Sequence, residues 1–432
     1  MRKEGFGELV SLAQALKIMD SFITPLLDEE VELGNSLFRV LAADIISPIS
    51  VPHFRKSAMD GFAVIASDTF GANDTHPKRL TIIDTIRAGM VSKKSITHSH
   101  CTEITTGAPI PEGADAVIMV ECTEDKIQNP KSQIQMLEDG KQRTEQKEKE
   151  LIIYKSVAPG DNVIEIGSDI KCGTLVFSKG TLLNSRYTGV LAAMGISSIR
   201  VKNKPIVGVL STGNEIIASG NPLVDGKIYD INSRTLIDAL IEQNCEPINL
   251  GLVKDNKAEL KNKILDSINT CDLLLISGGS SLGTEDLMKE IISEIGELLV
   301  HGIAVKPGKP TIIAKILGKP VIGLPGHPTS ALSDFYILVL PVIKKMLGIN
   351  PQEVQPQVEI IEAELNRKVV STIGRYEFLA VKIDVVQGKK YAAPVLRGSS
   401  AITTLATADG FIEISENTEV LTKGEIVKVK LF

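Results

Sequence analysis

The chain has 432 residues, which on length alone predicts roughly three domains. Its formal net charge is only −6 and its basic residues form no long run, which argues against nucleic acid or an anionic membrane surface as a partner. The five cysteines contain no CxxC pair, no run of about eighteen apolar residues occurs and the N-terminus lacks a signal-peptide pattern, so we expect a soluble, cytoplasmic protein that binds small molecules or other proteins.

The chain opens with apolar residues at helical intervals. They are Leu9, Leu12, Leu16, Met19 and Ile23. This spacing predicts an amphipathic helix over residues 8–27. From about 51 to 157, short apolar runs separated by Gly, Pro and Asp predict a β-rich domain. Inside that domain, residues 124–150 are charged and lack aromatic side chains, which predicts an exposed insertion.

A second kind of pattern begins near Pro205. The apolar runs PIVGVL, PINLGLV, DLLLIS and PVIGL have strand length and alternate with segments of helical periodicity. Strands that alternate with helices predict a parallel sheet covered on both faces. A predicted helix from about Thr329 to Met346 closes this unit, and the β-like tail from 352 to 432 predicts a small barrel or sandwich.

These patterns predict a multidomain α/β and β protein. We expect an N-terminal mixed helical and linker domain (1–50 plus 158–203), a β-rich inserted domain (51–157), a three-layer α/β domain with a mostly parallel sheet (204–349) and a small C-terminal β-barrel (350–432).

Small and hydroxylated residues follow three of the predicted strands, as STGNE, SGGSSLGT and PGHPTS. In an open parallel sheet, ligands bind at the carboxyl ends of the strands, where glycine lets the backbone approach an anion and hydroxyls donate to phosphate oxygens. Each loop alone is more often an ordinary strand-to-helix turn, but the three together favour a phosphorylated, nucleotide-like ligand. The candidate binding residues are Ser211, Thr212, Gly213, Glu215, Ser277, Gly278, Gly279, Ser280, Gly283, Pro325 and Gly326.

Charged residues stand beside these loops. Lys306 and Lys309 lie in KPGKP, where two prolines restrict the backbone, so the segment is either an anion site or an exposed basic turn. Glu215 and Asp286 are predicted at helix starts, where a carboxylate either complements the helix dipole or holds Mg²⁺ against a phosphate.

Seven motifs in this order resemble the molybdopterin molybdenumtransferase family, that is, MoeA and the gephyrin E domain. They are SAMDGFA (57–63), ITTGAPIPEGADAVIMVE (104–121), STGNE (211–215), DGKIYDINS (225–233), SGGSSLGTED (277–286), KPGKP (306–310) and GLPGHPTSAL (323–332). The resemblance covers nearly the whole chain. It implies a four-domain homodimer whose α/β domain is of the molybdopterin-binding type, and which inserts molybdate into adenylylated molybdopterin with Mg²⁺ and release of AMP.

The resemblance also implies roles for single residues. Lys309, Ser330, Arg375 in GRYEF and Ser399 in LRGSS match the positions that the family uses for molybdate. Asp286 matches the acidic residue near the scissile phosphoanhydride, as a ligand of Mg²⁺ or to direct water. The implied catalytic set is Asp60, Asp286, Lys306 and Lys309.

Asp60 lies in the SAMDG loop, which in the family reaches towards the active site of the other subunit. Taken alone, Asp before Gly also fits an Asx-turn. Asp169 and Asp255 match further acidic family positions.

The chain departs from the family pattern at some positions. The insertion at 124–150 is longer than the hairpin usual there, and His327 replaces the more common Asn or Tyr, which argues against a ligand role. His98 and His100 precede Cys101, but three donors in four consecutive residues make a poor closed metal site, so we predict a surface turn.

Two other functions remain open from the sequence. One is a non-catalytic, gephyrin-like scaffold, and the other is molybdopterin adenylyltransferase, which would not need residues 1–200 or the C-terminal domain. Tungstate is a dianion of nearly the same size as molybdate, so the sequence does not separate the two. The resemblance also suggests handover to the adenylyltransferase or to molybdoenzymes.

Overall fold

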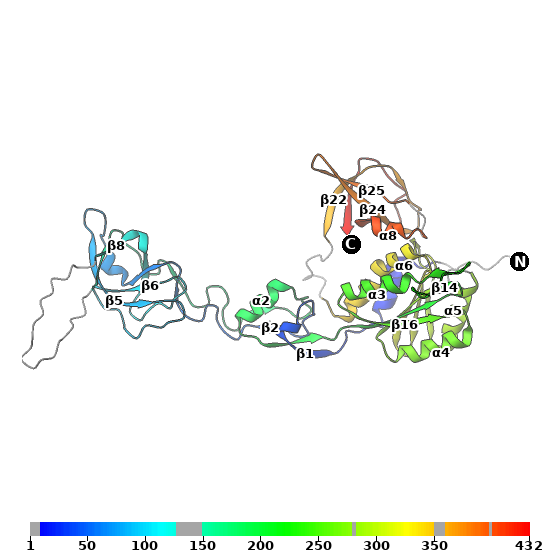
Figure 1. Ribbon diagram of the computed structural model, residues 1–432, viewed down its shortest axis with the longest axis horizontal. Helices are drawn as coiled ribbons and strands as arrows, with labels where there is room; N and C mark the ends of the chain where they lie inside the picture. The colour runs from blue at the N-terminus through cyan, green and yellow to red at the C-terminus, as the bar shows by residue number, and fades with distance from the viewer. Residues whose placement is uncertain (1–8, 127–148, 279–281, 350–358, 397–399) are drawn as a thin grey trace, which may run out of the picture. The chain divides into compact units, whose positions relative to one another are not determined.

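Figure 1 shows the computed structural model of the chain, which describes residues 9–126, 149–278, 282–349, 359–396 and 400–432. By its internal contacts the chain divides into two compact units. Unit 1 comprises residues 1–43, 178–188 and 197–432, and unit 2 comprises residues 44–177 and 189–196. The four domain boundaries given above stay a prediction.

A six-stranded mixed sheet lies at the centre of the α/β part of unit 1, in the order β16-β13-β17-β21-β20-β18. Its strands are β13 (Ile206–Thr212), β16 (Glu246–Val253), β17 (Leu273–Gly278), β18 (Glu297–His301), β20 (Ile312–Ile316) and β21 (Lys319–Leu324). The four strands predicted from apolar runs, β13, β16, β17 and β21, are parallel, and β20 and β18 add an antiparallel edge.

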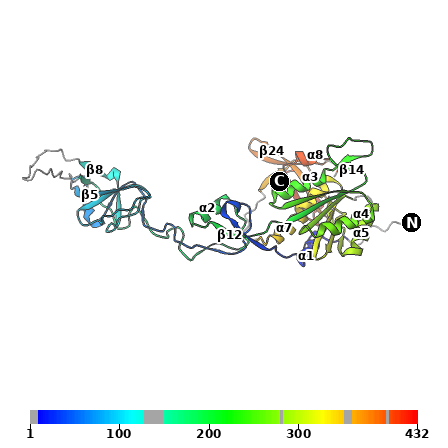
Figure 2. The same cartoon turned by 60° about the horizontal axis from the view of Figure 1, so that its bottom comes forward.

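Alternating side chains of these strands fill two separate cores. In β17, Leu273 and Leu275 join the core under α1, α3, α6 and α7, whereas Leu274 and Ile276 join the core under α4 and α5. The helices are α1 (Leu12–Asp20), α3 (Asn232–Glu242), α4 (Lys257–Ile268), α5 (Leu282–Ile295), α6 (Pro328–Asp334) and α7 (Leu340–Met346). Figure 2 shows α4 and α5 together on one side of the sheet. The predicted three-layer α/β architecture is confirmed.

The opening helix is shorter than predicted. It begins with a capping box between Ser11 and Gln14 and ends after Asp20, so the prediction was wrong for the residues that follow. The Ser21 hydroxyl donates to the carbonyl of Ile18 at 2.6 Å, and Pro25 has no N–H with which to continue the helix. Ile23 is nevertheless buried in the same core.

The helix that closes the α/β part contains a π-helical turn. Helix α6 continues into Phe335–Val339, which is π-helical, and then into α7. Pro341 lies in the first turn of α7, where its missing N–H removes one regular helical hydrogen bond.

Five strands of the C-terminal part close into a barrel, as predicted. Strand β24 pairs with β25 and β26, and β22 and β28 complete the ring. These strands are β22 (Ile360–Leu365), β24 (Tyr376–Val386), β25 (Lys389–Pro394), β26 (Gly410–Ile414) and β28 (Ile426–Leu431). A two-residue strand of the α/β part, β19 (Val305–Lys306), adds to β24 in parallel.

Short elements complete unit 1. They are β1 (Asp28–Glu32) paired with β12 (Ser198–Lys202), β14 (Ile216–Ile217) paired with β15 (Ile228–Tyr229), β23 (Val369–Val370) paired with β27 (Val420–Leu421), α8 (Thr403–Thr407) and a 3₁₀ turn at Leu33–Asn35.

Unit 2 is β-rich, as predicted, with a sheet in the order β7-β4-β6-β5-β9-β8. The strands are β4 (Gly61–Val64), β5 (Lys78–Ile86), β6 (His100–Ile104), β7 (Ala116–Met119), β8 (Thr123–Lys126) and β9 (Lys149–Ile153). Two smaller ladders pair β2 (Ile45–Ile46) with β11 (Leu175–Phe177) and β3 (Lys56–Ser57) with β10 (Val163–Ile164). The 3₁₀ turns are Ala66–Thr69 and Val120–Cys122, and residues 189–193 of α2 (Ser185–Ala193) also belong to unit 2.

The ends of the predicted insertion (124–150) are strand, because 124–126 belong to β8 and 149–150 to β9, which pair with each other, so the prediction was wrong there. Residues 127–148 lie outside the described residues. Among the helices that the structure describes, none is long and apolar enough to cross a membrane.

Candidate active site

The three glycine-containing loops begin side by side, because β13, β17 and β21 are neighbours in the sheet. Thr212 is paired with Gly278, and Ser277 is paired with Leu324. The sheet therefore brings the ends of these strands to one edge, as the sequence predicts. Gly283 lies in the first turn of α5, Pro325 is buried and Gly326 is half-buried. Gly279 and Ser280 lie outside the described residues.

Gly278 allows two of these loops to approach each other closely. Its φ is +135°, and a Cβ added there would lie 1.9 Å from the carbonyl oxygen of Thr212. No other residue fits that backbone without a shift of the strand ends.

Asn232, at the start of α3, connects two of the loops. Its side-chain amide donates to Ser277 Oγ at 2.8 Å and to the carbonyl oxygen of Gly326 at 2.9 Å. Asn232 stands in the DGKIYDINS motif, but the sequence pattern indicates no role for it. Its buried bond to Ser277 could not be predicted from the sequence, because the two residues are 45 positions apart in the chain.

Two buried polar atoms near these strand ends have no hydrogen-bond partner in the described part of the chain. They are Ser211 Oγ and Asn232 Oδ1. Buried polar groups are normally paired, so unpaired ones at a strand-end edge indicate a place where water or a ligand completes the bonding.

Asp255 holds the first loop in place. Its carboxylate accepts a bond from Thr212 Oγ1 at 3.0 Å and one from the backbone N–H of Asn214 at 3.3 Å. The hydroxyl hydrogen of Thr212 is thereby used within the protein, which leaves its oxygen as an acceptor.

Glu215 does not lie at a helix start, so that part of the prediction was wrong. The chain continues from Glu215 into β14, which pairs with β15, and α3 begins only at Asn232. A carboxylate at this position therefore has no helix dipole to complement. Asp286 lies inside α5, one turn after its first residue, and both carboxylates are exposed.

The described residues contain no group of three or more His, Cys, Asp or Glu that could hold a metal ion by themselves. Mg²⁺ is commonly bound by one or two carboxylates together with substrate phosphates. The exposed carboxylates of Glu215 and Asp286 fit that kind of donor set.

The KPGKP segment is attached to the barrel. In the β19–β24 ladder, Lys306 is paired with Glu377, and the Lys306 ammonium lies 3.1 Å from the Glu377 carboxylate. Glu377 is 6% exposed and also accepts a bond from the Ser371 hydroxyl at 2.6 Å. Glu377 stands in the GRYEF motif. From the sequence, Arg375 of this motif was the candidate for binding molybdate, and Glu377 was not.

Lys309 follows β19 by three residues, and Arg375 directly precedes β24. The backbone N–H of Tyr376, next to Arg375, donates to the carbonyl of Ala304 at 2.9 Å, and the carbonyl of Lys309 accepts from Ile303 at 3.0 Å. Both basic residues are half-buried. The structure thus brings together the two segments that carry them, while Ser399 lies outside the described residues.

A cavity of about 520 Å³ adjoins this ladder. It is lined by Lys306 and Pro307, by Thr329 and Ser333 of α6, and by barrel residues that include Glu377. Ser330, the predicted molybdate ligand on α6, is buried at 4% exposure, and His327 precedes the helix as an exposed residue. The cavity therefore lies where the lysine segment, α6 and the barrel meet.

We expect Lys306→Met to lower the free energy of unfolding by about 2 kcal/mol, because it would leave the buried Glu377 carboxylate without its cation. Lys345→Met is the matched control. Both lysine side chains are 41% exposed, but the partner of Lys345, Asp20, is 63% exposed. The control should lose at most about 0.5 kcal/mol in urea unfolding. Equal losses would contradict the assignment of a buried ion pair.

Asp60 lies in unit 2, and its carboxylate does not form the local Asx-turn that the sequence also allowed. Its carboxylate Oδ1 accepts bonds from the backbone N–H of Thr106 at 2.6 Å and from the Thr106 hydroxyl at 2.9 Å. These two bonds hold the pKa of the exposed Asp60 carboxyl below its usual value. Thr106 belongs to the ITTGAP motif and was not predicted as a partner.

The SAMDG loop that carries Asp60 is shaped by its neighbours. The Ser57 hydroxyl donates to the carbonyl of Met59 at 2.6 Å, and a Cβ on Gly61 would lie 1.9 Å from the carbonyl oxygen of Ile118. The local structure therefore accounts for serine at position 57 and glycine at position 61. Asp169, in the same unit, is exposed.

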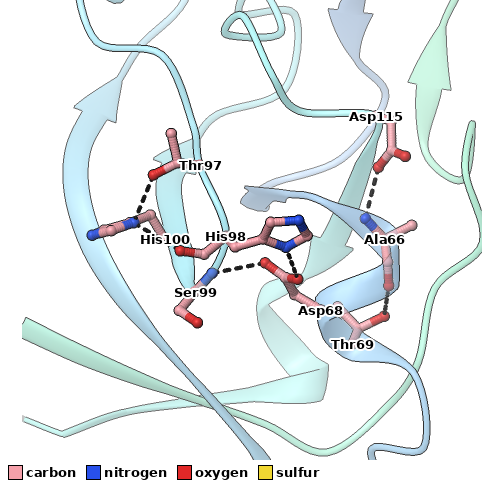
Figure 3. A network of polar contacts seen from close by, with 8 residues as sticks. All are labelled: Ala66, Asp68, Thr69, Thr97, His98, Ser99, His100 and Asp115. Carbon is pink, nitrogen blue, oxygen red and sulfur yellow. Dashed lines mark hydrogen bonds and ion pairs between the residues drawn. The ribbon is translucent and has the colours of Figure 1, made fainter.

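The histidines near Cys101 form a surface turn, as predicted. Figure 3 shows His98 Nδ1 bound to the Asp68 carboxylate at 2.7 Å, and the backbone N–H of Ser99 bound to the other carboxylate oxygen at 2.8 Å. His100 Nδ1 instead contacts Thr97 Oγ1 at 3.0 Å, and Cys101 is fully buried. The three side chains do not converge on one point.

Comparisons with known proteins place these features in a family. Models of the MoeA N-terminal region (domains I and II), a probable molybdopterin binding domain and the MoeA C-terminal region (domain IV) match residues 10–195, 208–345 and 362–432. The α/β part with its glycine loops thus corresponds to a domain of the molybdopterin-binding type.

Relatives match over the whole length. A molybdopterin molybdenumtransferase of Haemophilus influenzae is 34% identical over 98% of this chain and 99% of its own, and one of Bacillus subtilis is 33% identical over 93% and 89%. The crystal structure of the molybdopterin biosynthesis MoeA protein from Pyrococcus horikosii has a TM-score of 0.80 and 42% identity, and covers 98% of this chain and 99% of its own. The chain belongs to the MoeA family of molybdenum cofactor biosynthesis.

Proposed function

We propose that the protein inserts molybdate into adenylylated molybdopterin and releases AMP in a Mg²⁺-dependent reaction. The observation that carries the proposal is the β19–β24 ladder, which joins the segment of Lys309 to that of Arg375 beside the 520 Å³ cavity. Relatives named molybdopterin molybdenumtransferases that match over nearly the whole chain support the same reaction.

The residues fit the charges of the two substrates. Molybdate is a tetrahedral dianion, for which Lys309 supplies a point charge, Arg375 a planar pair of donors, and Ser330 and Ser399 hydroxyls. Lys306 is bound to Glu377, so in this proposal its contribution is to fix the segment on which Lys309 stands.

The phosphate and adenylate of the pterin nucleotide would bind at the three glycine loops, where the unpaired Ser211 hydroxyl can donate to an oxygen. Asp286 and Glu215 would hold Mg²⁺, which neutralises phosphate charge as the phosphoanhydride is cleaved.

Asp60 belongs to unit 2, and we propose that it completes the active site of a second subunit in a homodimer. An ionised carboxylate there could orient a lysine or a water molecule. Acceptor proteins for the finished cofactor, the adenylyltransferase or molybdoenzymes, would be partners of the same dimer.

The direct test mixes the purified protein with adenylylated molybdopterin, Mg²⁺ and molybdate and measures AMP. We expect AMP release that requires molybdate and Mg²⁺. AMP release at the same rate without molybdate, or none with it, would reject the proposed reaction.

The acid side of the pH–activity profile should depend on Thr106. An Asp with a lowered pKa stays ionised to lower pH than usual, and Thr106→Val removes one of the two bonds that lower it. The pKa of Asp60 should therefore rise. As the pH is lowered, the variant should lose activity at a higher pH than the wild type does. Thr85→Val is the control, because the Thr85 hydroxyl also donates to a carboxylate, that of Glu103, at 3.0 Å, and this carboxylate has no role in the proposed reaction. An acid limb unmoved by Thr106→Val would argue against a role for ionised Asp60.

A further inference from the structure

Asp334 is a buried carboxyl group that the proposed reaction does not use. It is the last residue of α6, its exposure is 0%, and it is part of no ion pair among the described residues. Burial raises the pKa of this carboxyl well above its usual value. A buried, unpaired carboxylate is costly, so such a group is normally held as the neutral acid.

The hydrogen bonds around Asp334 can be assigned by counting protons. Thr311 Oγ1 contacts two oxygens, the Gly308 carbonyl at 2.7 Å and Asp334 Oδ2. A hydroxyl has one hydrogen to donate, and a carbonyl oxygen has none. Both contacts are hydrogen bonds only if Thr311 donates to Gly308 and a protonated Asp334 donates to Thr311.

The other carboxyl oxygen lies against the lysine segment itself. Gly308 has a φ of +118°, and a Cβ added to it would lie 2.0 Å from Asp334 Oδ1. The contacts from Asp334 through Thr311 to Gly308 therefore determine the position of Gly308, the middle residue of KPGKP, which directly precedes Lys309.

We propose that Asp334, as a neutral acid, is a positioning residue that fixes the Lys306–Lys309 segment for oxyanion binding. The proposal rests on the proposed function for the meaning of that segment. Asp334 does not touch the substrate, since it is closed off from solvent, and it acts through Thr311 and Gly308.

The protonation state can be tested without any substrate. An unfolded Asp ionises near pH 4 whereas a neutral buried Asp334 stays protonated, so the folded wild type should lose stability as pH rises above about 4. Asparagine cannot ionise and can still donate to Thr311. The difference in Tm between Asp334→Asn and the wild type should therefore grow in favour of the variant from pH 4 to pH 8.

The exposed Asp225 gives the control, since Asp225→Asn should show no such growth. If Asp334→Asn instead loses stability relative to the wild type as pH rises, Asp334 is an ionised group in the folded chain and the proposal is overturned.

Measurements of AMP release then distinguish a positioning role of Asp334 from a direct chemical role. Asp334→Asn should keep kcat/KM for molybdate within about threefold, while Asp334→Leu, which cannot donate to Thr311, should lower it about thirtyfold, mainly through a higher KM. A folded Asp334→Asn variant that has lost turnover would overturn the proposal in favour of a chemical role for the carboxylate. If even the wild type releases no molybdate-dependent AMP, the proposed function fails, whereas the Tm comparison still decides the state of Asp334.

Discussion

Gly278→Ala is expected to lower the free energy of unfolding by about 3 kcal/mol or more and to abolish measurable AMP release. The added Cβ would meet the carbonyl oxygen of Thr212 at 1.9 Å, and the φ of +135° is one that side chains rarely adopt. Relief requires the ends of β13 and β17 to separate, and the glycine loops begin at those ends.

Gly220→Ala separates the two contributions to this loss. Gly220 also has a positive φ, +94°, but an added Cβ there meets nothing within 4 Å. It should cost only about 1 kcal/mol in chemical unfolding, because only the backbone conformation is penalised. If the two variants lose equal stability, the close approach of the strands is not what requires glycine at 278.

Lys309→Ala is expected to lower kcat/KM for molybdate by about a hundredfold or more, since a charge-assisted contact to a dianion is lost in a half-buried place. Arg375→Lys should lower it nearly as much, because an ammonium replaces a two-pronged donor with a point charge. Steady-state AMP release at varied molybdate concentration measures both effects.

Lys428→Ala controls for the loss of one positive charge, since Lys428 is exposed on β28. It should leave kcat/KM unchanged. A Lys309→Ala, Arg375→Ala double variant that keeps its cellular role would favour the scaffold function over the enzyme.

The parallel core of the α/β part could be predicted because each strand is an apolar run bounded by turn residues. The four runs are the four parallel strands, and the strand order brings their loops to one edge. Local patterns were less informative at ends of elements. The opening helix ends after Asp20 through a hydroxyl bond and a proline, although Ile23 still packs in the core.

The partners of the candidate site residues could not be predicted, because they are set by long-range pairing. Asp60 is bound by Thr106, 46 positions away, and Lys306 by Glu377, 71 positions away. Asp334 lies inside the predicted helix from Thr329 to Met346, where the sequence pattern indicates no special role, and only its burial reveals its environment. Glu215 was misplaced because β14 and β15 intervene before the helix.

The β19–β24 ladder also bears on how such a protein could change over evolutionary time. Main-chain hydrogen bonds do not depend on which side chains the strands carry, so the geometry of this junction can outlast substitutions of its basic residues. A variant without those basic residues would still fold with the same cavity at the junction. That robustness is a physical precondition for recruiting a protein of this architecture to a purely structural task.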